Sequence, residues 1–208
     1  MFGIAAFLGI YLTIQVGLPL LWMGIFCFLI GLLYAGGPIP ISSTPFGELA
    51  SGFTMGVMIT LISVYINSYQ IFQWNGQLLL EILLAASPEF VWIANIMFAN
   101  NICDAHEDEM NKRHTIVHYL GVKNSVAIWN LLNVLAIVLV FAAIYVGVYP
   151  PALIAIIIPL PFIIKQMILF THKQVKRETF VCSVKISING SLGLCLGFLM
   201  YWIYTMVH

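Results

Sequence analysis

The sequence predicts an all-α fold, a polytopic transmembrane bundle of about seven helices. Of the 208 residues, 62% are hydrophobic and only 8% are charged, and the mean hydropathy is +1.01. This composition lies outside the range of soluble domains. The apolar residues also form runs of about 20, the length that a helix needs to cross a bilayer. The basic residues gather in the connections between these runs, as they do in the loops on one side of a membrane.

Gly and Pro residues separate the apolar runs and set the expected boundaries. Gly17 ends the first run, and a loop rich in Gly, Pro and Ser over residues 36–45 precedes the third. Pro88 predicts a kink in the fourth span, and Pro159 and Pro161 predict a distorted sixth. The expected spans cover residues 2–16, 19–35, 46–69, 77–103, 124–148, 152–171 and 180–207, with a short interfacial helix over 115–120 that ends at Gly121. We expect them to form one domain over residues 1–208.

The distribution of basic residues predicts how the bundle is oriented. Seven of the eight lie in or beside two loops, Lys112, Arg113 and Lys123 in one and Lys173, Lys176, Arg177 and Lys185 in the other; the eighth is Lys165. Seven spans place both loops on the same side as residues 36–45, and the opposite connections contain no Lys or Arg. By the positive-inside rule this side is cytoplasmic. We therefore expect a multi-pass protein of the cell membrane, surrounded by lipid. The formal net charge of zero gives no support for a nucleic-acid partner.

The most polar stretch of the chain lies between residues 100 and 121. It contains the only two aspartates of the protein, Asp104 and Asp108. On a helix, their spacing places them on one face, with Asn100 a turn before and Lys112 a turn after. Residues 104–113 hold four acids and two bases, a shortage of positive charge that a hard cation such as magnesium could fill. The alternative interpretation of the same charges is a solvated loop.

The residues around the aspartates resemble a known family motif. Asn-Asn-x-x-Asp-x-x-x-Asp from Asn100, followed by a basic residue, Thr115 and Leu-Gly, is similar to the second aspartate motif of the UbiA superfamily of membrane prenyltransferases. The similarity is greatest to the branch that prenylates 1,4-dihydroxy-2-naphthoate in menaquinone biosynthesis. Tyr-Ala-Gly-Gly-Pro-Ile-Pro from Tyr34, and the Gly-Glu pair that ends at Glu48, resemble two further elements of that branch.

The resemblance implies nine helices around a central cavity and the transfer of a polyprenyl group from polyprenyl diphosphate to an aromatic acceptor, with magnesium as cofactor. Homogentisate, hydroxybenzoate and haem precursors are other acceptors in the family. The implied metal ligands are Asp104 and Asp108. These two residues and Arg113 form the implied catalytic set. The implied substrate-binding residues are Asn100, Asn101, Lys112, Arg113 and Tyr34.

The sequence also departs from the family pattern. Cys103 and Lys112 stand where many members have Arg and Gly, and no aspartate is present for the family's first aspartate motif. A family member with nine helices and two aspartate motifs would retain seven spans and one motif if it lost its first two helices. We therefore expect an N-terminally truncated member.

Three other interpretations follow from the same residues. A truncated member could be a catalytically inactive remnant or a partner subunit. Glu89, an acid inside the fourth span, could serve with the aspartate pair in an ion or solute transporter, because acids within membrane spans are costly and often functional. His114 and His118 have a spacing that could share a zinc ion, although no third ligand follows at zinc spacing.

Overall fold

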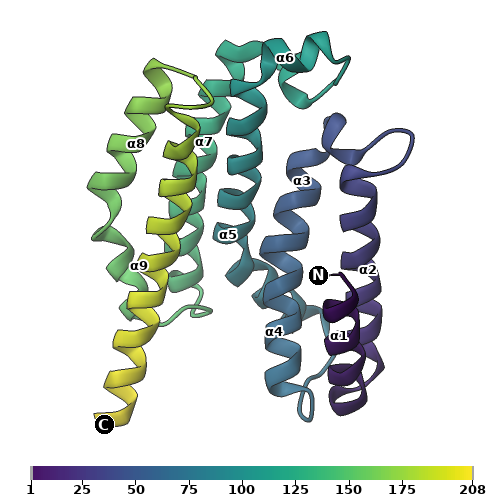
Figure 1. Cartoon of the computed structure of the whole chain (residues 1–208). Coiled ribbons are helices and arrows are strands. Elements are labelled where there is room, and N and C mark those ends of the chain that lie inside the picture. Colours follow the sequence, from purple (N-terminus) through teal and green to yellow (C-terminus); the bar gives the residue numbers. More distant parts are fainter. Residues whose placement is uncertain (1, 208) are drawn as a thin grey trace.

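The computed structural model describes residues 2–207, and its secondary structure over that range is helical, with no strand (Figure 1). Helices α1 (Phe2–Val16) and α2 (Leu18–Ala35) form a hairpin. The next pass is a segmented helix of α3 (Gly47–Gly52), a π-helical stretch η2 (Phe53–Met58) and α4 (Ile59–Ser68). Then follow α5 (Gly76–Cys103), the short α6 (Ala105–Met110), α7 (Ile116–Tyr145), α8 (Leu160–His172) and α9 (Phe180–Val207). The predicted all-α bundle is confirmed.

The helices differ in whether they can cross a bilayer. Five apolar segments are long enough: α2, Gly47–Ser68, α5, α7 and α9. A sixth is the bent pair of the 3-10 helix η3 (Pro151–Ile157) and α8, which meet at 43°. Helix α1 forms where predicted, but its 15 residues rise only about 22 Å, less than the hydrocarbon core of about 30 Å. The structure therefore gives five or six candidate spans, where the sequence predicted about seven.

The predicted breaks coincide with Gly and Pro residues. Gly17 and Gly121 have φ angles of 99° and 73°, in the left-handed region that favours glycine. Gly121 thereby divides the interfacial segment from the long apolar part of α7, as predicted. Pro159 lies at the bend between η3 and α8, where a proline cannot donate the backbone hydrogen bond that would continue a helix.

Helix α5 continues through Pro88, and nearby hydroxyl groups bond to two carbonyls of the preceding turn. Pro88 has no N–H to donate to the carbonyl of Leu84, and the Ser87 hydroxyl donates to that carbonyl at 2.7 Å. The Tyr149 hydroxyl donates to the next carbonyl, that of Ala85, at 2.5 Å. The expected distortion at Pro88 therefore does not end the helix.

A buried polar network joins α5, α7 and α9 within the larger hydrophobic core. The Asn95 amide donates to the Trp129 carbonyl at 3.0 Å, and the Trp129 indole N–H donates back to the Asn95 carbonyl at 3.2 Å. The Ser183 hydroxyl donates to the same Asn95 carbonyl at 3.1 Å. Such bonds between helices satisfy polar groups that lipid cannot. They fix the relative register of the three helices, and with it the position at which α5 ends.

Glycines allow the segmented helix to approach α5 closely. A Cβ atom at Gly56 would lie 2.6 Å from the backbone N and Cα of Phe90, and one at Gly52 would lie 2.7 Å from the Phe90 carbonyl oxygen. This is the close packing of small residues that is typical of membrane helices. It holds the end of α3 and the η2 stretch beside the middle of α5.

Gly56→Ala is expected to destabilise the bundle by about 1–3 kcal/mol, because the new methyl group overlaps backbone atoms that cannot move independently. Gly31→Ala in α2 is the matched control, since a Cβ there meets nothing within 4 Å. Thermal unfolding of the two variants in the same detergent measures the difference. Equal melting temperatures would show that α3–α4 and α5 are not in close contact.

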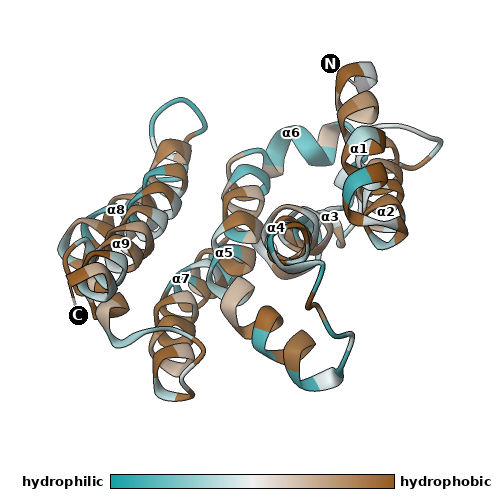
Figure 2. Cartoon of the chain, turned by 90° about the horizontal axis from the view of Figure 1, so that it is seen from below, coloured by the Kyte–Doolittle hydropathy of each residue, from teal (hydrophilic) through white to brown (hydrophobic). Residues whose placement is uncertain are grey.

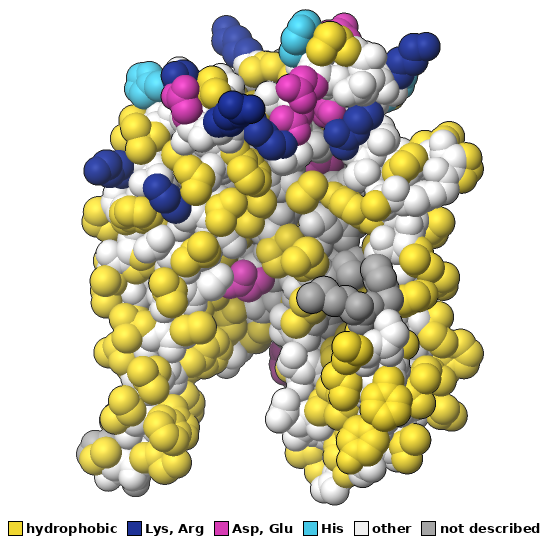
Figure 3. Space-filling model, in the orientation of Figure 1, with side chains coloured by type: hydrophobic (Ala, Val, Ile, Leu, Met, Phe, Trp, Pro, Cys, Tyr) yellow, Lys and Arg dark blue, Asp and Glu magenta, His cyan; other side chains and the backbone are white. Residues whose placement is uncertain are grey.

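Charged and polar residues gather at one end of the bundle. Figure 2 shows hydrophilic residues on α6 and on the loop before α9, whereas the long helices are mainly hydrophobic. In Figure 3, the Lys, Arg, Asp, Glu and His side chains cluster at the end of the molecule that carries α6. Residues 36–46, 104–115 and 173–179 all connect helices at this end (Figure 1), as the span count predicted. That this end faces the cytoplasm is still a prediction.

Candidate functional site

Asp104 lies at the junction between α5 and α6. Its backbone angles (φ −93°, ψ 4°) end the long helix. Hydrogen bonds from a backbone N–H to the carbonyl four residues earlier nevertheless continue across it. The Asp104 N–H donates to the Asn100 carbonyl at 3.0 Å, and the Asp108 N–H donates to the Asp104 carbonyl at 2.8 Å. The two aspartates are therefore one turn apart, as predicted, although a change of helix separates them.

Asp104 is paired with a lysine from a distant loop. The Asn100 amide donates to Asp104 Oδ2 at 3.1 Å, which confirms the expected contact between these neighbours. The Lys176 ammonium group forms an ion pair with the same carboxylate oxygen and also donates to Asn100 Oδ1 at 2.5 Å. Sequence analysis placed Lys176 at this end of the bundle but gave it no role. The cluster of basic residues in its loop was the only signal.

Asp108 is buried, with 3% of its surface exposed, and it is paired with Arg113. Arg113 Nη1 donates to Asp108 Oδ1 at 2.7 Å, and Nη2 donates to the Ser42 carbonyl at 2.9 Å. The His114 N–H donates to the Ser43 carbonyl at 3.1 Å. Arg113 therefore holds the carboxylate and also ties the α6 segment to the loop between α2 and α3.

Burial raises the pKa of Asp108 above its ordinary value. The positive charge of Arg113 opposes this effect, whereas the negative charge of Asp104 adds to it. The ionised carboxylate of Asp108 is therefore short of stabilising partners in this structure. A cation beside it would favour the ionised form.

Glu48 and Asn101 extend the acidic region towards α3. The Asn101 amide donates to Glu48 Oε1 at 2.7 Å, and the two residues are 2% and 8% exposed, respectively. Their remaining oxygens, Asn101 Oδ1 and Glu48 Oε2, are buried and have no hydrogen-bond partner among the described residues, and the same is true of Asp108 Oδ2 and the Tyr34 hydroxyl. The resemblance identified the Gly-Glu pair, but the sequence did not show that Glu48 contacts the aspartate segment.

Tyr34 and Lys112 border this region in different ways. The Tyr34 hydroxyl is buried near the end of α2, without a hydrogen-bond partner among the described residues. Lys112 does not lie on a helical face with Asp108, because α6 ends at Met110 and Lys112 takes a left-handed turn conformation (φ 54°). Lys112 instead lines an open pocket of about 470 Å³ together with Pro38, Ile39, Pro40, Ser43, Thr44, Pro45, Asn111, Arg113, His114 and Tyr119.

The histidine pair shows no zinc geometry in the described structure. The rings of His114 and His118 are stacked, with centroids 4.6 Å apart, and both residues are exposed. Over residues 2–207, no three His, Cys, Asp or Glu side chains lie close enough together to hold a metal ion by themselves. A metal site at this end therefore needs an amide or a bound ligand as well as carboxylates.

The donor atoms fit a magnesium ion better at Asp108 than at Asp104. Asp104 Oδ2 and Asn100 Oδ1 both accept from Lys176, and Asp104 Oδ2 also accepts from the Asn100 amide. Asp108 has one oxygen that is buried without a donor, and two further buried oxygens of the same kind belong to Glu48 and Asn101. Carboxylate and amide oxygens without donors are the ligands that a hard cation prefers.

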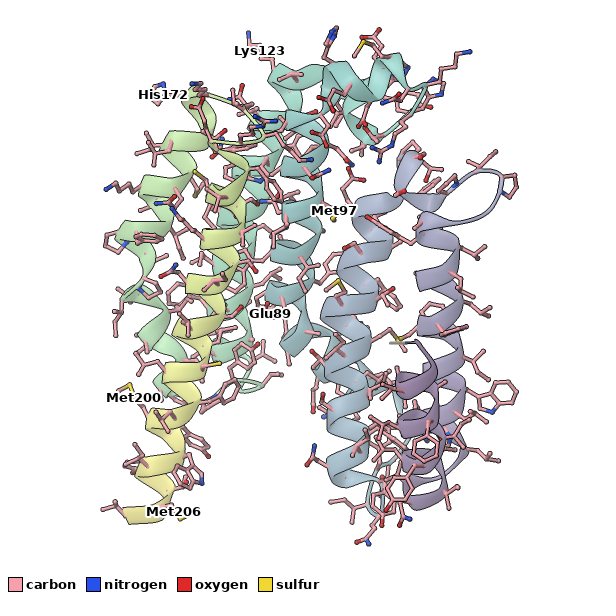
Figure 4. The ribbon with its side chains drawn as sticks, in the orientation of Figure 1. Glu89, Met97, Lys123, His172, Met200 and Met206 are labelled. Carbon is pink, nitrogen blue, oxygen red and sulfur yellow. The ribbon has the colours of Figure 1, made fainter. Side chains whose placement is uncertain are left out.

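Glu89 lies away from the aspartates, near the middle of α5 (Figure 4). The Ser191 hydroxyl of α9 donates to Glu89 Oε1 at 2.8 Å. This bond gives the acid a polar partner inside the bundle, as is usual for a carboxyl group at membrane depth. Glu89 therefore joins α5 to α9 and is not part of the charged end.

Comparisons with known proteins identify the family of the chain. Residues 1–189 match the UbiA prenyltransferase family. The chain is 32% identical over 160 residues to the 1,4-dihydroxy-2-naphthoate octaprenyltransferase of Bacillus subtilis (strain 168), an alignment that covers 77% of this chain and 49% of the relative. The chain thus spans about half the length of this relative, and no solved structure gives a significant match. The multi-pass helical bundle and the family match together show that the chain belongs to the UbiA prenyltransferase family.

Proposed function

We propose that this chain transfers a polyprenyl group from polyprenyl diphosphate to 1,4-dihydroxy-2-naphthoate, at a magnesium-dependent site on the cytoplasmic side of the cell membrane. One observation carries the proposal: Asp104 and Asp108 lie one turn apart at the polar end of an apolar bundle, each beside a basic side chain from the same end. The similarity to the 1,4-dihydroxy-2-naphthoate octaprenyltransferase of Bacillus subtilis supports the choice of acceptor.

Side chains at the charged end of the bundle suit the diphosphate group of a polyprenyl diphosphate. Asp104 and Asp108 would hold magnesium, which supplies positive charge to the diphosphate as the allylic C–O bond breaks. Arg113 and Lys112 line the open pocket and would bind the diphosphate oxygens. The substrate-binding residues at the border of the site would be Asn100, Asn101 and Tyr34. Guanidinium groups bind phosphate oxygens well because of their paired donors.

The apolar part of the bundle suits the polyprenyl chain. In Figure 3, the surface below the charged end is hollowed between α9 on one side and the α1–α4 helices on the other, and most side chains around this hollow are hydrophobic, with acidic side chains among them. A prenyl chain there would be kept from water, which would otherwise compete with the aromatic acceptor for the allylic carbon. The electron-rich ring of the acceptor would form the new C–C bond and then lose its proton.

The experiment is a transfer assay with the purified chain in lipid nanodiscs, with magnesium, a radiolabelled polyprenyl diphosphate and 1,4-dihydroxy-2-naphthoate. The proposal expects a prenylated product that is absent when EDTA replaces magnesium. Hydroxybenzoate and homogentisate in parallel reactions test the acceptor. No product with any of these acceptors would contradict catalysis by this chain alone and would favour an inactive member or a partner subunit. Ion flux through proteoliposomes without prenyl transfer would favour a transporter.

A further inference from the structure

Three buried oxygen atoms without hydrogen-bond donors come from three different helices at the charged end. They are Glu48 Oε2 of α3, Asn101 Oδ1 of α5 and Asp108 Oδ2 of α6. Each belongs to a side chain that is more than nine-tenths buried. A buried acceptor without a donor costs about 1–3 kcal/mol, and more when it is charged. Three such atoms at one end of a bundle favour an additional partner there, such as a bound cation.

Hydrogen bonds bring the elements that carry these three side chains together. The hydrogen bond of 2.7 Å from Asn101 Nδ2 to Glu48 Oε1 places the two planar groups next to each other. Arg113 bonds to both Asp108 and the Ser42 carbonyl, which brings α6 over the start of α3. The side chains thus converge from α3, α5 and α6.

The local charges leave room for one more cation. The acids Glu48, Asp104 and Asp108 face two basic partners, Arg113 on Asp108 and Lys176 on Asp104. Glu48 is bonded only to a neutral amide. A divalent hard cation takes carboxylate and amide oxygens as ligands, and it would supply the missing positive charge at the three oxygens that have no donor.

We propose that Glu48, Asn101 and Asp108 together form a binding site for a divalent hard cation, magnesium or manganese. Water molecules or substrate oxygens would complete the coordination. The inference deepens the proposed function, because it makes Glu48 and Asn101 ligands of the ion that Asp108 would hold there. It also makes Asp104, already paired with Lys176, the less important of the two aspartates for binding the ion in the absence of substrate. Cation binding itself does not depend on turnover.

The test is Mn²⁺ binding to the purified chain in lipid nanodiscs, measured by electron paramagnetic resonance of the free ion, without prenyl diphosphate or acceptor. The expected result is one site that Mg²⁺ competes for and that Glu48→Gln weakens by about tenfold or more. This variant keeps a carbonyl oxygen that can accept from Asn101. Glu48→Asp, which keeps the negative charge, should bind more tightly than Glu48→Gln. Glu107→Gln is the matched control, since Glu107 is an exposed acid of α6, and it should bind as the wild type does.

Wild-type affinity in Glu48→Gln, with an unchanged melting temperature in the absence of metal, would overturn the inference, and so would a wild-type chain that binds no Mn²⁺. The outcome can be distinguished from that of the transfer assay. Mn²⁺ binding that depends on Glu48 in a chain without prenyl transfer supports this site and contradicts the proposed activity. Prenyl transfer by a chain whose Mn²⁺ affinity is unchanged in Glu48→Gln would support the proposed activity and contradict this site.

Discussion

Replacing Asp108 by asparagine is expected to lower the rate of prenyl transfer by about 100-fold or more. The substitution removes the negative charge that would hold the cation while changing the shape of the side chain little. The remaining amide oxygen can still accept from Arg113, which now bonds to the carboxylate at 2.7 Å. The fold should therefore survive. Initial rates of product formation at saturating magnesium measure the effect.

Glu109→Gln is the control for Asp108→Asn. Glu109 is the next residue on α6 but is exposed, so this variant also removes one negative charge from the same short helix. It should keep the wild-type rate within about threefold, because an exposed charge is largely screened by water and salt. Asp108→Asn and Glu109→Gln variants with equal rates would show that Asp108 does no more than contribute to the surface charge.

Arg113→Met is expected to lower both stability and transfer. Methionine leaves the buried Asp108 carboxylate without its ion-pair partner and removes the bond to the Ser42 carbonyl. Breaking a fully buried pair costs about 3–5 kcal/mol, and the 31% exposure of the Arg113 side chain reduces the expected cost to about 2 kcal/mol. A fall in the apparent melting temperature measures it. Arg113→Lys keeps the charge without the forked geometry and should be intermediate.

A double-mutant cycle separates the ion pair from other effects of Arg113. Asp108→Asn combined with Arg113→Met should be less destabilising than the sum of the single variants, because the second change removes a partner that is already lost. Additive effects would show that the two side chains do not stabilise each other. The cycle needs only melting temperatures, so it can be measured whether or not the chain is an active enzyme.

The sequence was sufficient to predict the helices and most of their ends. Runs of apolar residues determine where the helices form, and Gly17, Gly121 and Pro159 interrupt the chain where the structure also does. The number of spans was harder to predict, because α1 is apolar enough to cross a bilayer but has only 15 residues. The bond from the Tyr149 hydroxyl to the Ala85 carbonyl, near Pro88 in α5, joins residues 64 positions apart, and no local pattern predicts such a bond.

The contacts of the candidate site are also of two kinds, those between residues close in the sequence and those between distant residues. The pairs Asn100–Asp104 and Asp108–Arg113 are four and five residues apart, so helical geometry and a following turn bring them together. The contacts Asn101–Glu48, Arg113–Ser42 and Lys176–Asp104 join residues 53, 71 and 72 positions apart. They form because Gly56 and the Asn95–Trp129 network set how the helices pack. Tertiary packing of this kind cannot be predicted from the spacing of residues along one segment.

The most direct test of the account is equilibrium binding of a polyprenyl diphosphate to the chain in lipid nanodiscs, with and without magnesium. The account predicts binding that requires magnesium and that is lost in the Asp104→Asn, Asp108→Asn double variant, whose fold is checked by its helical circular dichroism. Binding that is equally strong in EDTA, or unchanged in the double variant, would show that the two aspartates do not hold a cation for the diphosphate.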